Sequence, residues 1–441
     1  MAAIPTQGST FEKIEIYPLG KEDDLDSAMD LRLGVTQFTY FEDLMSPVIT
    51  AIMSVVSAGE GVYNTLPIRG GEQVKLHFTT PIEQNRQETP GKFELTMYVN
   101  KLTDYISEKQ KEQFALHLVS KEGIKNLNKR VIKKYKQKKI SEIIKDFLDM
   151  VECEYEDENI EETLNAFNFI GNMRKPFSLV PSLCSRAIPV GSNSGSAGFF
   201  LWQTQSGMKF KSIESIIRDK EVAQEYKYSR VNRGVDDPED SFTNIIQYSV
   251  ENNNNVMGSQ QTGEYSTYRI FFNPYTFEFT NPELSVFKPK ELKDGSKQET
   301  LGSTESEVSK EAEPNQIPNP EMAHRIISGV YSVGCLEESV DHPGTTVGTA
   351  STTVNMDNIE DVSQSISRYS SLFTQVLTLT VGINVALEAG DIIKCIFPQV
   401  SGEDDVDHEQ SGLYIIKEIS HFMSGNRSFT SMKVIRDTSG D

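Results

Sequence analysis

The sequence predicts a mainly β protein with α+β character, in which two duplicated β-barrel domains flank a small α/β domain and a flexible insertion interrupts the second barrel. Three observations support this fold class. Strand-like runs fill about the first 120 residues and return from about residue 365. A Lys-rich stretch with helical spacing separates these runs, and one β-rich block occurs twice.

Residues 1–118 are expected to form the first β-barrel domain. Residues 12–19 and 32–41 alternate between apolar and polar side chains, as half-buried strands do. Residues 47–56 (PVITAIMSVV) are apolar and partly β-branched, which also favours a strand.

Residues 119–222 are expected to form the α/β domain. Six apolar residues recur at helical spacing and predict a helix that packs by one face: Ile140, Ile143, Ile144, Phe147, Leu148 and Val151. The later run "AGFFLWQTQSGMKFKSIESII" predicts a strand, a tight turn at Ser206 and Gly207, a second strand and a helix from about Ser212. Trp202, the single tryptophan, lies in the first of these strands, where core packing is favoured over ligand stacking.

The second β-barrel domain is expected to come from two pieces of the chain, residues 223–287 and 361–441. Residues 288–360 between them are expected to form a partly disordered insertion. The stretch 288–320 has almost no large apolar residues, so burial cannot offset the entropy of ordering it. We therefore expect this stretch to be exposed and dispensable for folding of the core.

The repeated block supports the duplication. "IRGGEQVKLHF" (68–78) aligns with "LEAGDIIKCIF" (387–397), and "LTDYIS" (102–107) aligns with "ISHFMS" (419–424) at nearly the same distance. Each copy predicts a Gly-acid turn that starts a strand, followed by a long hairpin. Gly71, Glu72, Gly390 and Asp391 are therefore predicted to form equivalent structural turns, with a left-handed backbone or little room for a side chain at each glycine.

His421 is the histidine for which a catalytic role has to be weighed against a structural one. The repeat aligns it with Asp104, so we expect its position to need only a polar group that faces solvent or a hairpin neighbour. A general base needs a positioned partner, and none is suggested here. A structural role is favoured over catalysis, and His421→Ala is expected to change stability by about 0.5 kcal/mol or less.

Composition argues against several classes of function. The net charge of −21 argues against stable nucleic-acid binding, which needs a surplus of Lys and Arg on one face. The four cysteines (Cys153, Cys184, Cys335 and Cys395) form no CxxC pair and predict reduced thiols rather than a zinc or disulfide framework. No apolar run approaches the about 20 residues of a membrane span, and the start lacks the order of a signal peptide, so we expect no membrane insertion and synthesis in a cytoplasm.

Three further motifs each have a simple structural interpretation. "GSNSGSAG" (191–198) predicts a flexible loop, since Asn193 occupies the nucleophile position of a G-x-S-x-G frame. The acidic loop 403–409 predicts a solvated hairpin end; its binding of a cation is left open, because the EF-hand spacing is absent. The Lys-rich run 121–139 favours a solvated helix face or a protein contact over phosphate binding. No cofactor, metal site or catalytic residue is predicted, so the chain is not expected to be an enzyme.

Three stretches together resemble the central baseplate hub protein of contractile-tailed phages of the T-even and cyanophage type. They are "IRGGEQVKLHFTTP", "AGFFLWQTQSGMKFKSIESI" and "LEAGDIIKCIFPQV" with the following "SGLYIIKEISHFMSGNRSFTSMKVIRDTSG", in the expected order. The resemblance implies a homotrimeric ring that joins a trimeric central spike to a hexameric tail tube and contacts other baseplate and tape-measure proteins. It also implies a location in the virion, after assembly in the host cytoplasm, and passage of DNA during ejection.

The repeat gives a separate reason for such a role, because three chains with two similar barrels each present six similar units. We expect these units to line an acidic channel, with the Lys-rich run 121–139 outside it. A hub component of a bacterial contractile injection system of type VI kind is the alternative. A cell-wall hydrolase is disfavoured, because the sequence offers no acid/base pair for it.

Overall fold

The structure is a computed structural model of the whole chain. It describes residues 8–21, 24, 27–58, 68–83, 90–108, 111–164, 166–190, 198–219, 221–229, 243–252, 261, 267–273, 277–279, 286–287, 301, 325–330, 365–366, 368–399 and 406–437.

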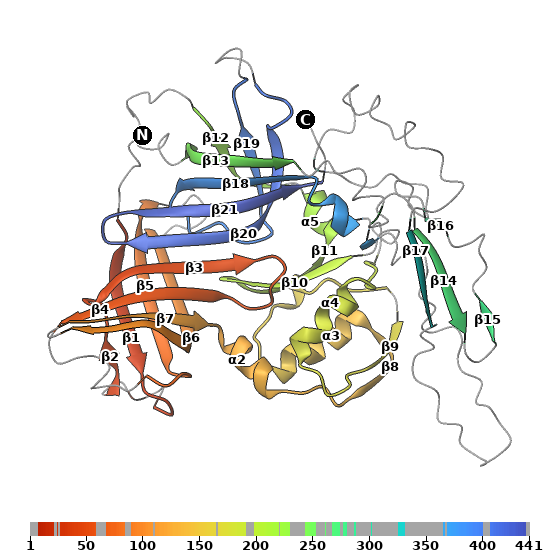
Figure 1. The fold of residues 1–441 in the computed structure, drawn as a ribbon, viewed down its shortest axis with the longest axis horizontal. Coiled ribbons are helices and arrows are strands. Elements are labelled where there is room, and N and C mark those ends of the chain that lie inside the picture. Colours follow the sequence, from red (N-terminus) through yellow and green to blue (C-terminus); the bar gives the residue numbers. More distant parts are fainter. Residues whose placement is uncertain are drawn as a thin grey trace.

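A mainly antiparallel sheet of 13 strands dominates the fold (Figure 1). Its first seven strands come from the N-terminal part of the chain: β1 (Thr10–Tyr17), β2 (Met29–Asp30), β3 (Val35–Asp43), β4 (Thr50–Ala58), β5 (Gln73–Glu83), β6 (Pro90–Glu108) and β7 (Lys111–Val119). The other six come from later parts: β12 (Val222–Lys227), β13 (Ile245–Asn252), β18 (Gln375–Gly382), β19 (Ile392–Ile396), β20 (Gly412–Ser424) and β21 (Ser428–Arg436). We call these sets the first segment and the second segment. The mainly β fold class is confirmed.

Alternation along the strands explains why each segment has an inner face. In β7, every second residue is buried, and the same holds for most of β3 and β21. The buried residues of the first segment form one core around Phe38, Tyr40 and Phe78. Those of the second segment form another around Tyr414, Leu379 and Met432.

Among the described strands the two segments do not form separate closed barrels, so that expectation is corrected. They join edge to edge, because β3 of the first segment pairs with β20 of the second along seven residue pairs. The strand order is β13-β18-β21-β20-β3-β4-β7-β6-β5-β1-β2, with β19 beside β20 and β12 beside β19. This order does not close on itself among the described strands. One extended, curved sheet therefore replaces two closed cylinders.

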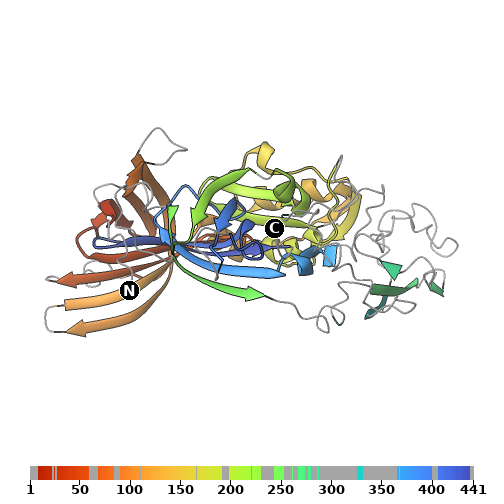
Figure 2. The same cartoon turned by 90° about the horizontal axis from the view of Figure 1, so that it is seen from above.

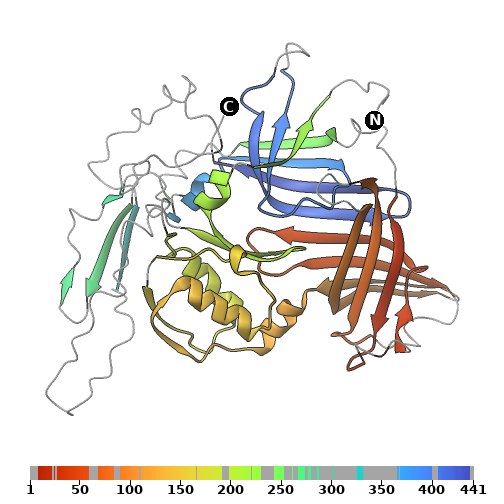
Figure 3. The ribbon, with the colours of Figure 1, turned by 180° about the vertical axis from the view of Figure 1, so that it is seen from behind.

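An α/β unit lies between the segments in sequence and beyond the ends of β3 and β4 in space (Figure 3). It consists of α2 (Lys121–Asn128), β8 (Lys134–Lys139), α3 (Ile140–Met150), the 3-10 turn Asp157–Asn159, β9 (Ala166–Ile170), α4 (Pro176–Cys184), β10 (Phe199–Thr204), β11 (Gly207–Ser212) and α5 (Ile213–Asp219). The predicted helix is confirmed, and its apolar stripe is buried as expected. The strand-turn-strand-helix prediction for 197–217 is also confirmed.

A small separate sheet changes the expected course of residues 223–360. β14 (Thr267–Asn273) pairs with β15 (Glu278–Phe279), β16 (Val286–Phe287) and β17 (Arg325–Val330) rather than with the main sheet. Among the described strands of residues 223–287, only β12 and β13 belong to the second segment. Seen from above, the first segment forms one end of the elongated molecule, and the α/β unit and this small sheet lie toward the other (Figure 2).

Most of the expected insertion 288–360 lies outside the described residues, but two parts of it do not. β17 is a strand of the small sheet, and Leu301 is buried. The backbone N–H of Leu301 donates to Asp437 Oδ1 (3.0 Å), and its side chain packs with Trp202 and Leu372 in a core shared by the second segment and the α/β unit. The expectation of an exposed stretch is therefore wrong at Leu301.

Two features are absent from the residues that the structure describes. None of the described helices is long and apolar enough to cross a membrane. Within the same residues, no three side chains of the His, Cys, Asp or Glu type are grouped so as to hold a metal ion.

Candidate functional site at the seam between the segments

The turn at Gly71 immediately precedes β5 in the first segment. Gly71 has φ 96°, a left-handed conformation that glycine adopts without steric cost. Its backbone N–H donates to the carbonyl oxygen of Val99 (2.7 Å), and the N–H of Val99 donates back to the carbonyl oxygen of Glu72 (2.9 Å). This pair of bonds fixes the start of β5 against β6.

The turn at Gly390 immediately precedes β19 in the second segment and has the same geometry. Gly390 has φ 92°. Its N–H donates to the carbonyl oxygen of Ile416 (2.8 Å), and the N–H of Ile416 donates to the carbonyl oxygen of Asp391 (2.9 Å). Val99 and Ile416 therefore occupy corresponding places in the two segments.

The acidic residue after each glycine closes its turn through the side chain. Glu72 Oε1 accepts from the backbone N–H of Arg69 (2.7 Å), three residues earlier. Asp391 Oδ2 accepts from the backbone N–H of Glu388 (3.1 Å), also three residues earlier. A carboxylate that accepts a backbone N–H is a common way to satisfy a turn, which explains the Gly-acid pattern.

The correspondence extends through the neighbouring strands, with the same residue spacing up to Thr103 of β6. In this correspondence β5 matches β19, β6 matches β20, β7 matches β21, β4 matches β18 and β3 matches β13. Each pair of neighbouring strands in the first segment has the register of the matching pair in the second. Two bulges correspond as well: the one after Val99 matches the one after Ile416, and the one after Val35 matches the one after Ile245. β1 breaks the pattern, because it is antiparallel to β5 whereas β12 is parallel to β19.

The seam itself is the pairing of β3 with β20, from Asp43 opposite Glu418 to Gln37 opposite Ser424. His421 lies in its middle opposite Tyr40, and the two rings stack with centroids 5.9 Å apart. His421 Nδ1 lies 3.0 Å from Thr430 Oγ1. The His421 side chain is thus part of the packing between the segments.

The expectation that His421 faces solvent is wrong. His421 is 1% exposed, whereas the aligned Asp104 is exposed at φ 54°. The difference arises because β3 pairs with this part of β20 along its second edge, while no described strand pairs with the second edge of the matching part of β6. Burial lowers the pKa of His421 to about 4, so the ring is neutral at pH 7.

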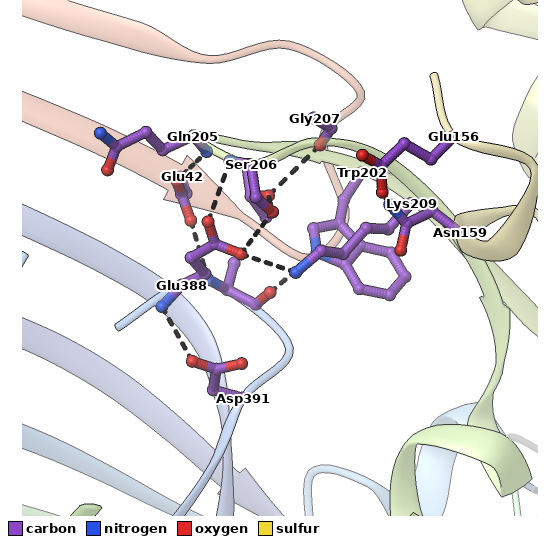
Figure 4. Close-up of polar contacts among 12 residues, drawn as sticks. Glu42, Glu156, Asn159, Trp202, Gln205, Ser206, Gly207, Lys209, Glu388 and Asp391 are labelled. Atoms are coloured by element: carbon purple, nitrogen blue, oxygen red, sulfur yellow. Dashed lines mark hydrogen bonds and ion pairs between the residues drawn. The ribbon is translucent and has the colours of Figure 1, made fainter. Parts of the chain in front are cut away.

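Glu42 is a buried carboxylate beside the seam (Figure 4). It is 3% exposed and accepts three hydrogen bonds: from the hydroxyl of Tyr40 (2.6 Å), the backbone N–H of Gln205 (2.8 Å) and the backbone N–H of Ala389 (2.8 Å). Burial, followed by the nearby charge of Glu388, raises the pKa of Glu42 to about 8. Glu42 thus ties the first segment to the β10–β11 hairpin and to the Gly390 turn.

Glu388 completes the junction from the second segment. Its carboxylate forms an ion pair with Lys209 (2.6 Å) and accepts from the backbone N–H (2.9 Å) and hydroxyl (2.8 Å) of Ser206 (Figure 4). Burial acts to raise the pKa of Glu388, but Lys209 and Ser206 outweigh it and hold that pKa below its usual value. Trp202, which is 2% exposed, donates from Nε1 to the carbonyl oxygen of Ala389 (2.8 Å) and fills the space beside Gly390.

Sequence reasoning located both turns but missed Glu42, Glu388 and Lys209. A signal for Glu42 was available: it follows Phe38 and Tyr40 at a spacing of two, so it had to point into the same core. A carboxylate on the inner face of a strand needs buried donors, and this requirement predicts a contact with another segment. No comparable signal marked Glu388 or Lys209.

The described residues of the other sequence candidates contribute no reactive arrangement to this site. Residues 191–197 and 400–405 lie outside the described residues. Asp407, from the acidic loop, accepts from the N–H groups of Glu409 (3.0 Å) and Gln410 (3.2 Å) and so closes a turn. Cys153, Cys184 and Cys395 are buried free thiols, and burial raises the pKa of each.

The Lys-rich run 121–139 lies in the α/β unit, on α2 and β8. Several of its lysines form ion pairs with acidic residues of the same unit: Lys125 with Glu152, Lys133 with Asp146, Lys138 with Glu142 and Lys139 with Glu162. Local acids therefore neutralise much of its positive charge.

The fold defined by this sheet and junction is that of phage tail proteins. The chain is similar to the 43 kDa tail protein of prophage MuSo2 from Shewanella oneidensis, with a TM-score of 0.52, 10% identity, and coverage of 97% of this chain and 98% of that one. It is equally similar to a tail protein from Neisseria meningitidis, with a TM-score of 0.52, 10% identity and coverage of 97% of both chains.

A more particular relative is found by sequence. The chain is 22% identical over 444 residues to the probable baseplate hub protein gp334 of Vibrio phage KVP40. The alignment covers 99% of this chain and 96% of that protein. No protein-family model matches the chain. The resemblance to phage baseplate hub proteins is thereby confirmed.

Proposed function

We propose that this protein is the structural baseplate hub of a contractile phage tail, located in the virion after assembly in the host cytoplasm. In this role three copies form a ring that joins the trimeric central spike to the hexameric tail tube and gives passage to DNA. The protein acts as a scaffold and not as an enzyme. Similarity to the Vibrio phage hub protein and to phage tail proteins supports the general class.

The observation that carries the proposal is the common register of the two segments. Five strands of each segment share one order of pairing, two bulges and one form of turn closure, which supports a duplicated origin. A ring of three such chains would present six similar sheet segments. Threefold symmetry on the spike side would thus be adapted to sixfold symmetry on the tube side.

The junction around Glu42 supports this scaffold role. It holds two segments and the α/β unit together through a part-buried ion pair and through backbone hydrogen bonds to the buried Glu42, which favours one relative orientation. An adapter between two symmetries needs such rigidity, because its two repeats must present the same spacing to every tube subunit. We therefore assign the buried junction an architectural task.

The electrostatic balance supports a conduit that does not retain DNA. The net charge is −21, and acidic partners neutralise much of the Lys-rich run. We propose that the six segments line an acidic channel and that the run lies outside it, where it could contact a baseplate or tape-measure protein. At physiological salt, micromolar protein should not shift the fluorescence anisotropy of a labelled DNA duplex. Salt-sensitive binding would contradict this part of the proposal.

Co-expression tests the adapter role directly. The protein would be produced with the central spike and tail tube proteins of the same phage, and purified complexes would be weighed by native mass spectrometry. We expect a complex of three copies with one spike trimer, able to bind tube subunits in multiples of six. A single copy bound to either partner, or no complex with either, would contradict the proposal.

A further inference from the structure

Two of the strand edges that have no neighbouring strand among the described residues of the main sheet are those of β6 and β13. β6 pairs with β5 only up to Tyr98, so residues 101–108 pair with β7 alone. β13 pairs with β18 alone. Exposed strand edges present unpaired N–H and C=O groups that another strand can occupy.

The seam inside the chain shows which edges fit one another. Residues 418–424 of β20 correspond to the open half of β6, and β3 corresponds to β13 through the common register. In the seam, β20 pairs with β3. The chain therefore already contains one copy of the contact that its two open edges would make with each other.

Among the described strands these two edges do not pair with one another: β13 begins the strand order, and the open half of β6 lies seven strands along it. They are complementary between copies: the open half of β6 on one copy matches β13 on the next. Such a contact is heterologous, because it uses two different surfaces, and it produces a ring when the rotation between copies closes.

The common register gives the residue pairs of this contact. Thr103 pairs with Ala115 as Ser420 pairs with Ser431, so Thr103 corresponds to Ser420. Glu251 corresponds in the same way to Phe41, and Phe41 lies opposite Ser420 in the seam. Thr103 of one copy is thus placed opposite Glu251 of the next.

A bulge distinguishes this contact from the seam inside the chain. The pairing of β6 with β7 shifts between Thr103 and Ile106, and Asp104 within the bulge has φ 54°. β20 has no shift at the matching place, so Ile106 takes the position of Phe422. This register places Ile106, which is 54% exposed here, opposite Ser249 of the next copy.

Charge agrees with the same register. Lys101 and Glu251 are both exposed. With Thr103 opposite Glu251, Lys101 lies on the same face two residues along and becomes a diagonal neighbour of Glu251. Long side chains reach across such a diagonal, so the two charges attract one another across the contact.

We infer that residues 101–108 of β6 pair antiparallel with β13 of a second copy, with Thr103 opposite Glu251 and Ile106 opposite Ser249. This inference rests on the proposed ring and adds to it the edges, the direction and the register of the contact. The ring then alternates two kinds of seam: one within each chain, centred on His421, and one between chains, containing the Asp104 bulge.

Cysteine cross-linking tests the register. In the seam, the backbone N–H of Leu44 donates to the carbonyl oxygen of Lys417, so alternation makes Phe41 and Ser420 a non-hydrogen-bonded pair. Cα atoms in such pairs lie about 4.5 Å apart, within the range of about 4.4–6.8 Å that a disulfide spans. The Thr103→Cys/Glu251→Cys variant should therefore oxidise to covalent trimers on a non-reducing gel.

Matched variants control for register and location. Thr103→Cys/Ser249→Cys keeps both thiols on the same face but out of register, and it should give little cross-linked product. Phe41→Cys/Ser420→Cys should form its disulfide within one chain and migrate as a monomer. Each single-cysteine variant should give no trimer, and a mixture of Thr103→Cys with Glu251→Cys chains should stop at dimers.

A charge-reversal pair gives a second test that does not depend on the cysteine variants folding. Lys101→Glu and Glu251→Lys should each weaken the trimer at least several-fold at low salt, and the double variant should restore it. A trimer that does not cross-link in register, cross-links equally through Ser249→Cys, or ignores the charge variants would overturn the inference while leaving the ring intact. A protein that stays monomeric with its partners present would overturn the ring and the inference together.

Discussion

Replacing each turn glycine with alanine separates backbone strain from packing at the junction. Both Gly71 and Gly390 have left-handed backbones, so an alanine at either position costs about 1–2 kcal/mol of conformational energy. The surroundings differ. A Cβ at Gly71 would lie 3.1 Å from a methyl group of Leu19, whose side chain is 67% exposed and free to move.

A Cβ at Gly390 would lie 2.8 Å from Cζ2 of Trp202, a side chain that is 2% exposed and hydrogen-bonded to Ala389. Overfilling such a site costs about 1–3 kcal/mol more. We therefore expect Gly71→Ala to lower the free energy of unfolding by about 1–2 kcal/mol and Gly390→Ala to lower it by about 2–5 kcal/mol.

The assay is urea titration followed by tryptophan fluorescence. Trp202 is the only tryptophan, so its emission reports the junction itself. Gly390→Ala should lower the urea midpoint more than Gly71→Ala and should also shift the emission of the folded protein. Equal midpoints for the two variants would refute the reasoning, because they would show that the indole ring does not constrain the Gly390 turn.

Three further predictions concern the seam and the junction. His421→Ala should lower the free energy of unfolding by about 2–4 kcal/mol in denaturant titration, because it removes a buried ring and its contact with Thr430. Asp104→Ala should change it by about 0.5 kcal/mol or less. Similar losses in the two variants would contradict the difference in burial. The pKa of His421 is lowered to about 4, so the unfolded state binds a proton that the folded state does not, and stability is lost as pH falls from about 6.5 toward 4. Relative to wild type, His421→Asn should lose less stability across this window, by up to about 3 kcal/mol, and an unchanged pH dependence would show that the ring is not held neutral. Lys209→Met should cost about 1–3 kcal/mol, because it removes the charged partner of the part-buried Glu388. Lys209→Met/Glu388→Leu should recover part of that loss, and an additive further loss in the double variant would argue against coupling.

Local patterns predicted local features well. The Gly-acid pattern indicated turns because few residues other than glycine adopt a left-handed backbone and because a following carboxylate satisfies the turn's N–H groups. The helix at 140–150 was predictable because its apolar residues recur at the helical period. These features depend on residues that are neighbours in the sequence.

Long-range pairing was beyond such patterns. His421 was expected to face solvent because its aligned partner is Asp104, yet burial at this position depends on β3, almost 380 residues earlier in the chain. Likewise, no local signal separates two closed barrels from one joined sheet, because the strands alternate identically in both cases. The parallel pairing of β14 with β17 joins residues from two expected domains for the same reason.

In the proposed ring, three copies of this chain present six similar sheet segments around one axis. Electron cryomicroscopy of the purified protein bound to its spike tests this claim most directly, through end-on averages of the ring. We expect an inner wall with near-sixfold density formed by the two segments of each chain, surrounded by three α/β units. Particles with a single copy, or a ring whose inner wall shows only threefold features, would contradict the account.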